Sequence, residues 1–260
     1  MLNNEIYVKA VKNNFQFLKE SPSVRDAYLR SIEIPDFGYL LPLCKGLMGD
    51  EKVIQDLTEW RNTNVNAYPT QFIATKKSTE NWFAKGLIEN DGRILFLIVT
   101  NSGKTIGHIG FNGCINLKHN FEIDNVVRGI SDSPKGIMGA AMNSLINWAK
   151  NMLPVESINL KVMSDNDHAI NFYLKNGFIK KSLIPLSRSV DGDMISYNEI
   201  LDGSKSPHNF LEMIYSPENI SGKEMILTAG PSISAKESSY AFDAAEKGWN
   251  SQWSKYLTKF

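Results

Sequence analysis

The spacing of apolar residues along the chain predicts a mixture of helices and strands. Apolar positions three or four residues apart predict helices over residues 51–61, 79–88, 136–151 and 167–176. Residues 1–37 are also expected to be largely helical, with a break at Ser21-Pro22. Short apolar or alternating runs predict strands over residues 38–48, 93–100, 105–111, 121–128, 158–163, 180–189 and 194–200.

The segments between these strands indicate how the strands connect. Residues 101–104, Asn-Ser-Gly-Lys, favour a hairpin turn, and Asp191-Gly192 favours a second one. Strand 121–128 is instead followed by a helix and then by strand 158–163, an order typical of a βαβ unit. The expected fold class is α/β (α+β), with a mixed, mostly antiparallel central sheet flanked by helices.

Changes in composition divide the chain into four expected segments. A helical extension over residues 1–37 precedes the main domain, which covers residues 38–201. Residues 202–224 are rich in Ser, Pro, Gly and charge, a composition that predicts a linker. Residues 225–260 follow as a C-terminal tail, in which Ser234 and Glu237 form a capping-box pattern that predicts a helix.

Composition and charge exclude several classes of function. The 28 basic and 28 acidic residues give a net charge of zero, which argues against a broad nucleic-acid surface. The two cysteines and four histidines lack the spacing of a metal site, so no metal is expected. The longest apolar run, residues 94–99, is too short to span a membrane, and the first residues lack the apolar core of a signal peptide. We therefore expect a cytoplasmic protein without membrane insertion and without a nucleic-acid partner.

The start of the helix predicted over residues 136–151 has the features of an anion site. Residues 133–139 read Ser-Pro-Lys-Gly-Ile-Met-Gly. A helix N-terminus offers free backbone N–H groups and the positive end of the helix dipole, and glycine lets a phosphate approach the backbone. Lys135 could help to neutralise such a phosphate, although a solvated lysine is the simpler interpretation.

A more specific pattern lies just downstream. Asn166 ends a strand, Ala169 and Tyr173 follow on a helix, and Gly177-Phe178 closes the unit. This segment resembles the Asn-x-x-Ala-x-x-x-Tyr-x-x-x-Gly-Phe signature of the GNAT acetyltransferase superfamily at every fixed position. Gly136 also matches that superfamily's Arg/Gln-x-x-Gly-x-Gly/Ala motif, in which Ser133 and Met138 replace the first and last residues.

The resemblance implies that the protein binds acetyl-CoA and transfers its acetyl group to an amine. In this family the asparagine contacts the cofactor and the tyrosine protonates the leaving thiolate, a task that requires a positioned acid. The strand before the helix is expected to hydrogen-bond the pantetheine arm through its backbone. The catalytic acid is then Tyr173, whose alternative role is that of a core aromatic. The expected cofactor-binding residues are Val126, Val127, Arg128, Ser133, Lys135, Gly136, Ile137, Met138, Gly139, Asn166 and Phe172.

The general base is open among three residues. Glu122 lies on the strand before the helix, where some members of the family carry a catalytic glutamate. The two-residue period of a strand puts Glu122 and Asp124 on one face, so one is a candidate base and the other a candidate for binding the acceptor. His108, on the neighbouring strand, is the rival because histidine titrates near neutral pH. Many members of the family use ordered waters instead.

The acceptor pocket is expected near the end of the helix at residues 51–61. Arg61 precedes a loop that contains Tyr68 and Phe72, where GNAT enzymes often build this pocket. Arg61 is a candidate contact for a nucleotide diphosphate, and its alternative role is to cap the carbonyl groups at the end of the helix.

The C-terminal tail carries a second resemblance. Residues 225–260 are similar to the opening of the DegT-type sugar aminotransferases, in the run from Ile226 to Ile233 that contains Gly230-Pro231 and in Gly248-Trp249. The Schiff-base lysine and phosphate-binding loop of that family lie beyond this segment, so neither pyridoxal phosphate nor transamination is expected.

The two resemblances together suggest an acceptor. DegT-type enzymes install an amine on a nucleotide-linked keto-sugar, and an acetyltransferase domain could then acetylate it. The expected function is N-acetylation of an amino-deoxy sugar, nucleotide-linked, in surface polysaccharide biosynthesis. The alternatives are a peptide or protein N-acetyltransferase, and a non-catalytic CoA-binding scaffold paired with an aminotransferase. A homodimer is left open.

Overall fold

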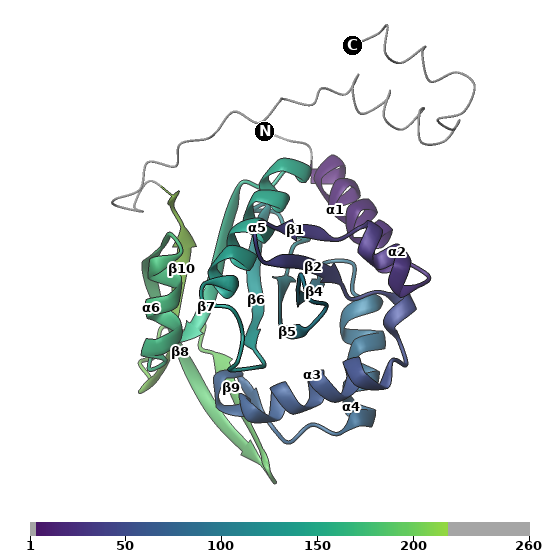
Figure 1. Cartoon of the computed structure of the whole chain (residues 1–260). Coiled ribbons are helices and arrows are strands. Elements are labelled where there is room, and N and C mark those ends of the chain that lie inside the picture. The colour runs from purple at the N-terminus through teal and green to yellow at the C-terminus, as the bar shows by residue number, and fades with distance from the viewer. Residues whose placement is uncertain (1–3, 218–260) are drawn as a thin grey trace, which may run out of the picture. The chain divides into compact units, whose positions relative to one another are not determined.

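One curved sheet organises residues 4–217, the part of the chain that the computed structural model describes (Figure 1). Its strand order is β1-β2-β4-β5-β6-β7-β10-β8-β9-β3. The strands are β1 Ile32–Ile34, β2 Gly38–Pro42, β3 Thr70–Gln71, β4 Ile94–Thr100, β5 Thr105–Asn112, β6 Asn120–Arg128, β7 Ser157–Met163, β8 Phe178–Asp191, β9 Met194–Glu199 and β10 His208–Tyr215. The helices are α1 Asn4–Lys19, α2 Val24–Leu29, α3 Glu51–Thr63, α4 Lys76–Asn81, α5 Ile137–Met152 and α6 Asp167–Lys175, with short helical turns η1 Lys45–Leu47, η2 Val65–Ala67 and η3 Trp82–Ile88.

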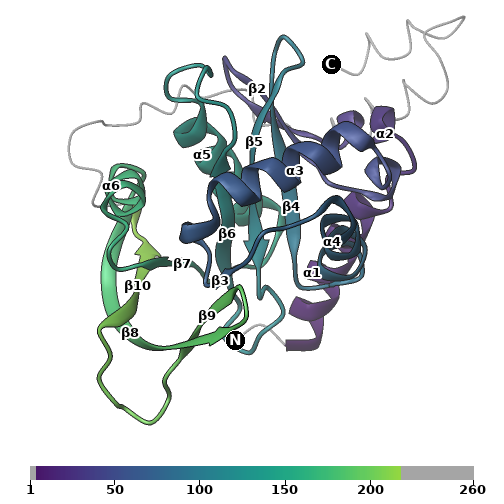
Figure 2. The same ribbon diagram turned by 90° about the horizontal axis from the view of Figure 1, so that it is seen from below.

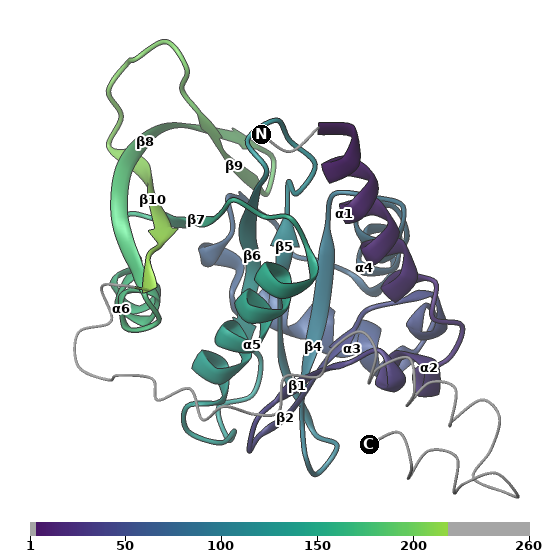
Figure 3. The ribbon, with the colours of Figure 1, turned by 90° about the horizontal axis from the view of Figure 1, so that it is seen from above.

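Helices cover both faces of the sheet, each over its own apolar core (Figures 2 and 3). The core on one face joins buried side chains of α1 and α5 to the sheet, among them Phe15, Leu145 and Phe96. The core on the other face joins α3 and η3 to the sheet through Leu57, Trp60 and Phe83. Because helical periodicity places the apolar stripe of each helix on the sheet, this three-layer arrangement buries both faces of the sheet.

Strands β6 and β7 are the parallel pair of the sheet, and they separate after four residues. They pair from Asn120 and Ser157 to Ile123 and Leu160. Beyond Ile123, the rest of β6 has no partner on β7 within the described residues, whereas it remains paired with β5 on its other side. The two strands therefore separate beyond this point.

A bulge in β6 lies at the same place. The register between β5 and β6 shifts between His108 and Gly110, and Asn125 on β6 has a positive φ of 52°. Asparagine tolerates this conformation better than most residues, and a bulge reverses the alternation of side chains. Accordingly, Ile123 belongs to the core under α5, whereas Val127 belongs to the core under α3.

The last strands curve back towards the loop after α3 (Figure 2). β8 and β9 form a long antiparallel hairpin, and β9 also pairs with β3, which lies in that loop. The backbone N–H of Tyr197 donates to the carbonyl oxygen of Pro69 at 2.8 Å. This pairing holds the loop of residues 64–75 against the C-terminal part of the sheet.

The predicted fold class is confirmed, as are the hairpin of β4 and β5 and the parallel pair β6 and β7. The strand predicted over residues 38–48 is shorter, because β2 ends at Pro42 and the turn η1 follows. The N-terminal segment contains the predicted helices and also β1, and α1 buries Tyr7, Val11 and Phe15 in the core. α1 is therefore an integral layer of the domain.

The prediction of a linker over residues 202–224 was wrong for its middle part. β10 runs through it from His208 to Tyr215 and lies between β7 and β8. Leu211 and Met213 are buried in the apolar core, and this burial outweighs the Ser- and Pro-rich composition on either side. The tail expected over residues 225–260 lies outside the described residues.

Candidate active site

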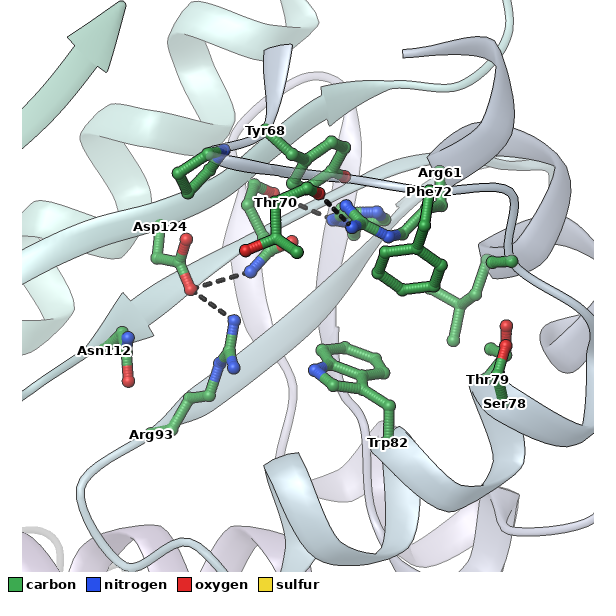
Figure 4. Close-up of a pocket in the computed structure, with 15 residues that line it drawn as sticks. Arg61, Tyr68, Thr70, Phe72, Ser78, Thr79, Trp82, Arg93, Asn112 and Asp124 are labelled. Atoms are coloured by element: carbon green, nitrogen blue, oxygen red, sulfur yellow. Dashed lines mark hydrogen bonds and ion pairs between the residues drawn. The ribbon is translucent and has the colours of Figure 1, made fainter. Parts of the chain in front are cut away.

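A cavity of about 460 Å³ opens between α3, α4, the loop that carries β3, and the strands β5 and β6 (Figure 4). One end is mostly aromatic and the other is polar. The residues that line it are Leu57, Arg61, Tyr68, Pro69, Thr70, Phe72, Ala74, Ser78, Thr79, Trp82, Arg93, His108, Asn112, Asp124 and Asn125.

Arg61 organises the aromatic end. Its guanidinium carbon lies 4.0 Å from the centre of the Tyr68 ring and 4.6 Å from that of Phe72. Its Nη2 donates to the carbonyl oxygen of Thr70 at 2.7 Å. Asn62 anchors the same loop, since its side chain accepts from the N–H of Ala74 at 2.7 Å and donates to its carbonyl at 3.0 Å. Arg61 therefore fixes the shape of the pocket wall.

An ion pair defines the polar end. Arg93 Nη2 lies 2.5 Å from Asp124 Oδ2, and Asn125 Nδ2 donates to the same oxygen at 2.7 Å. The Arg93 guanidinium also lies over the Trp82 ring, 5.3 Å from its centre. The side chain of Asn112 projects into the same end, next to Arg93 (Figure 4). Arg93 neutralises the charge of Asp124. This end of the cavity therefore offers both hydrogen-bond donors and hydrogen-bond acceptors.

His108 is buried at the edge of the cavity and its tautomer is fixed by a backbone contact. Its Nδ1 lies 2.8 Å from the carbonyl oxygen of Asn125. A carbonyl only accepts, so Nδ1 carries the proton and Nε2 carries the lone pair. Burial lowers the pKa of His108 to about 4. The imidazole is therefore neutral at physiological pH and is a hydrogen-bond acceptor at Nε2.

Glu122 lies on the same face of β6 as Asp124, but it does not line the cavity. Burial raises its pKa above the usual 4.5, although the charge of Lys161 opposes this shift. Lys161 Nζ lies 3.8 Å from Glu122 and only 2.5 Å from Glu199 on β9. Glu122 is therefore a carboxylate with a raised pKa that lies two residues before Asp124 on β6, outside the cavity lining.

The N-terminus of α5 has the predicted geometry of an anion site. Gly136 has a φ of +93°, which favours glycine, and no side chain caps the helix. The N–H groups of Met138 and Gly139 have no hydrogen-bond partner among residues 4–217. The side chain of Ile137 is in the core, and its N–H donates to the carbonyl of Pro134 at 3.3 Å. Two donors at the start of α5 are thus free for a ligand.

Gly139 also has a packing role. A Cβ at this position would lie 2.8 Å from Asn176 Oδ1, at the end of α6. The absence of a side chain therefore lets α6 approach α5 closely. Lys135 is exposed beside this site, and Ser133 accepts a hydrogen bond from Arg128 Nε at 2.9 Å.

The downstream signature residues lie on and before α6. Asn166 is the N-cap of the helix and its Oδ1 accepts from the N–H of Ala169 at 3.1 Å. Tyr173 is 9% exposed and packs edge-to-face on Phe172 and Phe178. Burial raises the pKa of Tyr173 well above its usual 10, and the charge of Asp124 adds to the shift. The Tyr173 hydroxyl is therefore protonated and within electrostatic reach of Asp124.

The structure brings together Arg61, His108 and Asp124 in one cavity, and Tyr68 and Phe72, from the loop where the acceptor pocket was expected, line it as well. Gly136, Met138 and Gly139 do not line this cavity. The sequence analysis missed Trp82, Arg93 and Asn112. Arg93 directly precedes a buried strand, and a charged residue at that point was the available signal.

Residues 4–217 contain neither a metal-ligand cluster nor a helix suited to span a membrane. No three or more His, Cys, Asp or Glu side chains in this part of the chain are grouped as metal ligands would be. In the same part of the chain, none of the helices has the length and apolar content required to span a membrane.

Comparison with protein families identifies the domain. The family described as "Acetyltransferase (GNAT) domain" matches residues 50–179, which is half of the chain and includes both the cavity and the start of α5. The chain belongs to this GNAT acetyltransferase family. It is an N-acetyltransferase whose acetyl donor is acetyl-CoA. No curated protein sequence matches the chain significantly.

Solved structures share the fold at low sequence identity. The spermidine N-acetyltransferase of Vibrio cholerae, in complex with CoA and spermine, is 13% identical, with a TM-score of 0.51 over 66% of this chain and 94% of that one. An acetyltransferase from Salmonella typhimurium that modifies the N-terminal serine of ribosomal protein L7/L12 is 15% identical, with a TM-score of 0.54 over 72% and 98%. The microcin C7 self-immunity acetyltransferase, in complex with acetyl-CoA and AMP, is 18% identical, with a TM-score of 0.51 over 69% and 93%.

Proposed function

We propose that the acceptor of this acetyltransferase is the amine of an amino-deoxy sugar, linked to a nucleotide, and that the cavity next to His108 and Asp124 binds it. The observation that carries this proposal is the lining of the cavity. Aromatic side chains that suit the apolar face of a sugar ring lie opposite Arg93, Asp124 and Asn112, which suit its hydroxyl groups. A volume of about 460 Å³ accommodates such a molecule.

Charge also distinguishes this acceptor from the alternatives. The cavity lining contains two arginines and one carboxylate, and that carboxylate is paired with Arg93. A polycation or the amino end of a peptide would favour an acidic lining. A nucleotide diphosphate would instead be attracted by the net positive lining. One structural neighbour of similar fold, the microcin C7 self-immunity acetyltransferase, was solved in complex with both acetyl-CoA and AMP.

The C-terminal tail supports the same acceptor by resemblance alone. Residues 225–260 are similar to the opening of the DegT-type sugar aminotransferases, which supply the amine that this reaction would consume. The tail lies outside the described residues. Pairing of the tail with an aminotransferase belongs to the non-catalytic scaffold alternative.

The donor is proposed to lie in the splay between β6 and β7. The free N–H groups of Met138 and Gly139 suit its pyrophosphate, and the unpaired edge of β6 at Val126 and Val127 suits the amides of its pantetheine arm. Asn166 would then act by capping α6 and so positioning Tyr173, since its Oδ1 is already committed to Ala169.

The proposed proton transfers follow from the three titratable groups. Glu122 takes the proton of the acceptor ammonium through a water molecule, because its pKa is raised and it lies outside the cavity. The neutral amine, oriented by Nε2 of His108, attacks the acetyl carbonyl. The C–S bond breaks, and Tyr173 donates its hydroxyl proton to the leaving sulfur. The second proton that the attacking nitrogen loses as it becomes an amide then restores the Tyr173 hydroxyl. Desolvation keeps Tyr173 protonated until that step.

A thiol-release assay with acetyl-CoA tests the acceptor class. Nucleotide-linked 3-amino and 4-amino deoxy-sugars are compared with free amino sugars, spermidine and peptides with a free N-terminus. Turnover on a nucleotide-linked amino sugar, reduced strongly in Trp82→Ala, supports the proposal. Turnover only on peptides or polyamines contradicts it. Calorimetric binding of CoA without turnover on any amine would favour the scaffold alternative.

A further inference from the structure

The buried ammonium group of Lys19 takes no part in the proposed reaction, yet it is bound to a segment that forms part of the cavity wall. Lys19 is the last residue of α1 and is 3% exposed. Its Nζ donates to the carbonyl oxygen of Leu87 at 2.8 Å and to that of Asn90 at 2.6 Å. Both carbonyls lie at the C-terminal end of η3, and a helix end leaves such groups without a full set of partners. A side chain from α1 therefore caps η3.

Burial of a charged group at this position is costly. An ammonium that leaves water loses much of its solvation free energy unless hydrogen bonds replace the water. Burial accordingly lowers the pKa of Lys19 to about 8, although the charge of Asp91 opposes this shift. The group therefore remains mostly charged at pH 7. An apolar side chain would fill the same space without this cost, so the two hydrogen bonds to η3 are the specific property that the lysine supplies.

The segment that Lys19 holds carries two residues of the acceptor cavity. Trp82 is the first residue of η3, and Arg93 follows Asn90 by three positions. The carbonyl of Asn90 accepts from the backbone N–H of Arg93 at 3.2 Å as well as from Lys19. The guanidinium of Arg93 in turn lies over the Trp82 ring, 5.3 Å from its centre. The anchored end of η3 therefore bears on the placement of both side chains.

The winding of η3 makes an external anchor at its end important. The N–H of Glu89 donates to the carbonyl of Ala84, five residues earlier, at 3.0 Å. This π-type winding is rare and is found frequently at functional sites. η3 packs in the core under α3, whereas α1 packs in the core under α5. Lys19 therefore joins two layers that cover opposite faces of the sheet.

We propose that Lys19 is a positioning residue for the acceptor, because it holds the end of η3 and so sets the placement of Trp82 and Arg93 in the cavity wall. This inference rests on the proposed acceptor cavity. Lys19 does not line that cavity, and α1 precedes the residues that match the acetyltransferase family. The N-terminal helix thus contributes to acceptor binding through η3, without touching the acceptor.

Fluorine NMR of the full-length protein, labelled with 5-fluorotryptophan, reports on Trp82 without any acceptor. The chain has five tryptophans, and Trp82→Phe and Trp148→Phe identify the resonances of these two. Lys19→Met removes both hydrogen bonds and should shift or broaden the Trp82 resonance. The Trp148 resonance should stay in place, and because this ring stacks on Phe15 of α1 it would reveal a general disturbance of that helix. Lys19→Arg keeps the charge and the donors and should resemble the wild type.

Acceptor kinetics connect the placement of Trp82 to function. With the amine that the acceptor panel identifies, Lys19→Met should raise KM by about tenfold, lower kcat less, and leave the affinity for CoA unchanged. Lys19→Arg should recover most of this loss. Lys9→Met, at an exposed position of α1, is the matched control and should behave as the wild type in both measurements.

The outcomes separate this inference from the proposed acceptor. An unmoved Trp82 resonance, an unchanged KM, or an equal loss of acceptor and CoA binding in Lys19→Met would overturn the positioning role. If Lys19→Met does not fold, Lys19→Gln replaces it, and failure of both variants to fold beside a folded Lys9→Met would make Lys19 a residue of stability alone. A wild type that acetylates none of the amines would overturn the proposed acceptor, whereas the Trp82 resonance would still decide whether Lys19 positions this wall.

Discussion

The Nδ1 atom of His108 donates to the carbonyl oxygen of Asn125, the residue at which β6 bulges. In a regular ladder this carbonyl would accept from the backbone of β5, and the bulge frees it for a side chain. One irregular residue therefore fixes the tautomer of the histidine that lines the cavity.

The burial of His108 makes stability depend on pH. Its pKa falls from 6.5 to about 4 on folding, so the unfolded state binds more protons between these values. The free energy of unfolding should therefore fall as the pH drops from 6.5 towards 4. This one group contributes at most about 3 kcal/mol over that window.

His108→Gln should remove this dependence, because a glutamine can keep a bond to the Asn125 carbonyl but does not titrate. Urea denaturation at pH 7.5 and pH 5 measures the change in both proteins. The matched control is His168→Gln, which removes an exposed imidazole on α6. An equal loss of stability on acidification in His108→Gln and in the wild type would contradict the assigned state of His108.

Tyr173→Phe should reduce the rate of acetyl transfer and leave the affinity for acetyl-CoA nearly unchanged. The hydroxyl is buried and protonated, so it is suited to donate to the leaving sulfur. Loss of one positioned acid lowers turnover by about 10²–10⁴-fold. Single-turnover thiol release gives the rate, and calorimetry with CoA gives the affinity.

Tyr215→Phe is the matched control for this experiment. Tyr215 packs edge-to-face on Phe178, as Tyr173 does, so both variants remove a hydroxyl from the same aromatic cluster. The control should retain the wild-type rate. A parallel loss of rate and CoA affinity in Tyr173→Phe would assign this residue to cofactor binding instead of proton transfer.

The acid limb of the pH–rate profile should report Glu122. Burial raises the pKa of Glu122 above 4.5, and the charge of the nearby Lys161 opposes part of this rise. The logarithm of kcat/KM should therefore fall as the pH drops through this raised value, since the base becomes protonated. Lys161→Met removes the opposing charge and should move the limb to higher pH, whereas Glu122→Gln should abolish the limb and lower the rate by about 10²–10⁴-fold. A limb that survives unchanged in Glu122→Gln would point to His108 or to ordered waters as the base.

The sequence predicted local elements and the order of the main sheet better than it predicted the site. Helical periodicity located α3 and α5 within two residues, because each buries one stripe of side chains. β10 was missed because it pairs with β7 and β8, which precede it in the chain, and its flanks read as a linker. The bulge at Asn125 has no pattern of its own in the sequence, since it depends on pairing with β5.

The same distinction applies to the candidate site. Gly136 and Tyr173 follow from a short, contiguous pattern, and their catalytic roles stay predictions. Trp82, Arg93 and Asn112 come from three separate elements, and only the fold brings them to one cavity. Arg93 also neutralises Asp124, which changes that carboxylate from a candidate base into half of an ion pair.

Arg61 should affect the acceptor and not the donor. Its guanidinium is sandwiched between Tyr68 and Phe72 and holds the carbonyl of Thr70, so it shapes the wall of the cavity. Arg61→Lys keeps the charge but loses the planar stack. The KM for the acceptor found by the panel should rise by about tenfold, with CoA affinity unchanged. Arg188→Gln, at an exposed position of β8, is the control, and equal kinetics in all three proteins would contradict this role for Arg61.

Gly129→Ala should destabilise the protein, because the Trp60 indole lies flat against this glycine. A Cβ at residue 129 would be 2.0 Å from Cε2 of Trp60, which is buried in the core under α3. A rigid ring in a packed core cannot move aside without strain, so the expected loss is about 1–3 kcal/mol of the free energy of unfolding. Gly92→Ala is the matched control. Its Cβ would meet its nearest neighbour at 3.5 Å, and it should leave stability unchanged or raise it by about 0.4–1 kcal/mol.

Trp60→Phe in the same background identifies the cause of the loss. The smaller ring leaves room for the added methyl group, so the double variant should lose less stability than the sum of the two single variants. Urea denaturation of the four proteins of this cycle, at pH 7.5, gives the coupling energy. Strict additivity would mean that Gly129 is required for its backbone and not for the space that Trp60 fills. The Trp60 ring that Gly129 accommodates also packs 5.9 Å from the ring of His108, between centroids, so it supports a side chain that lines the cavity.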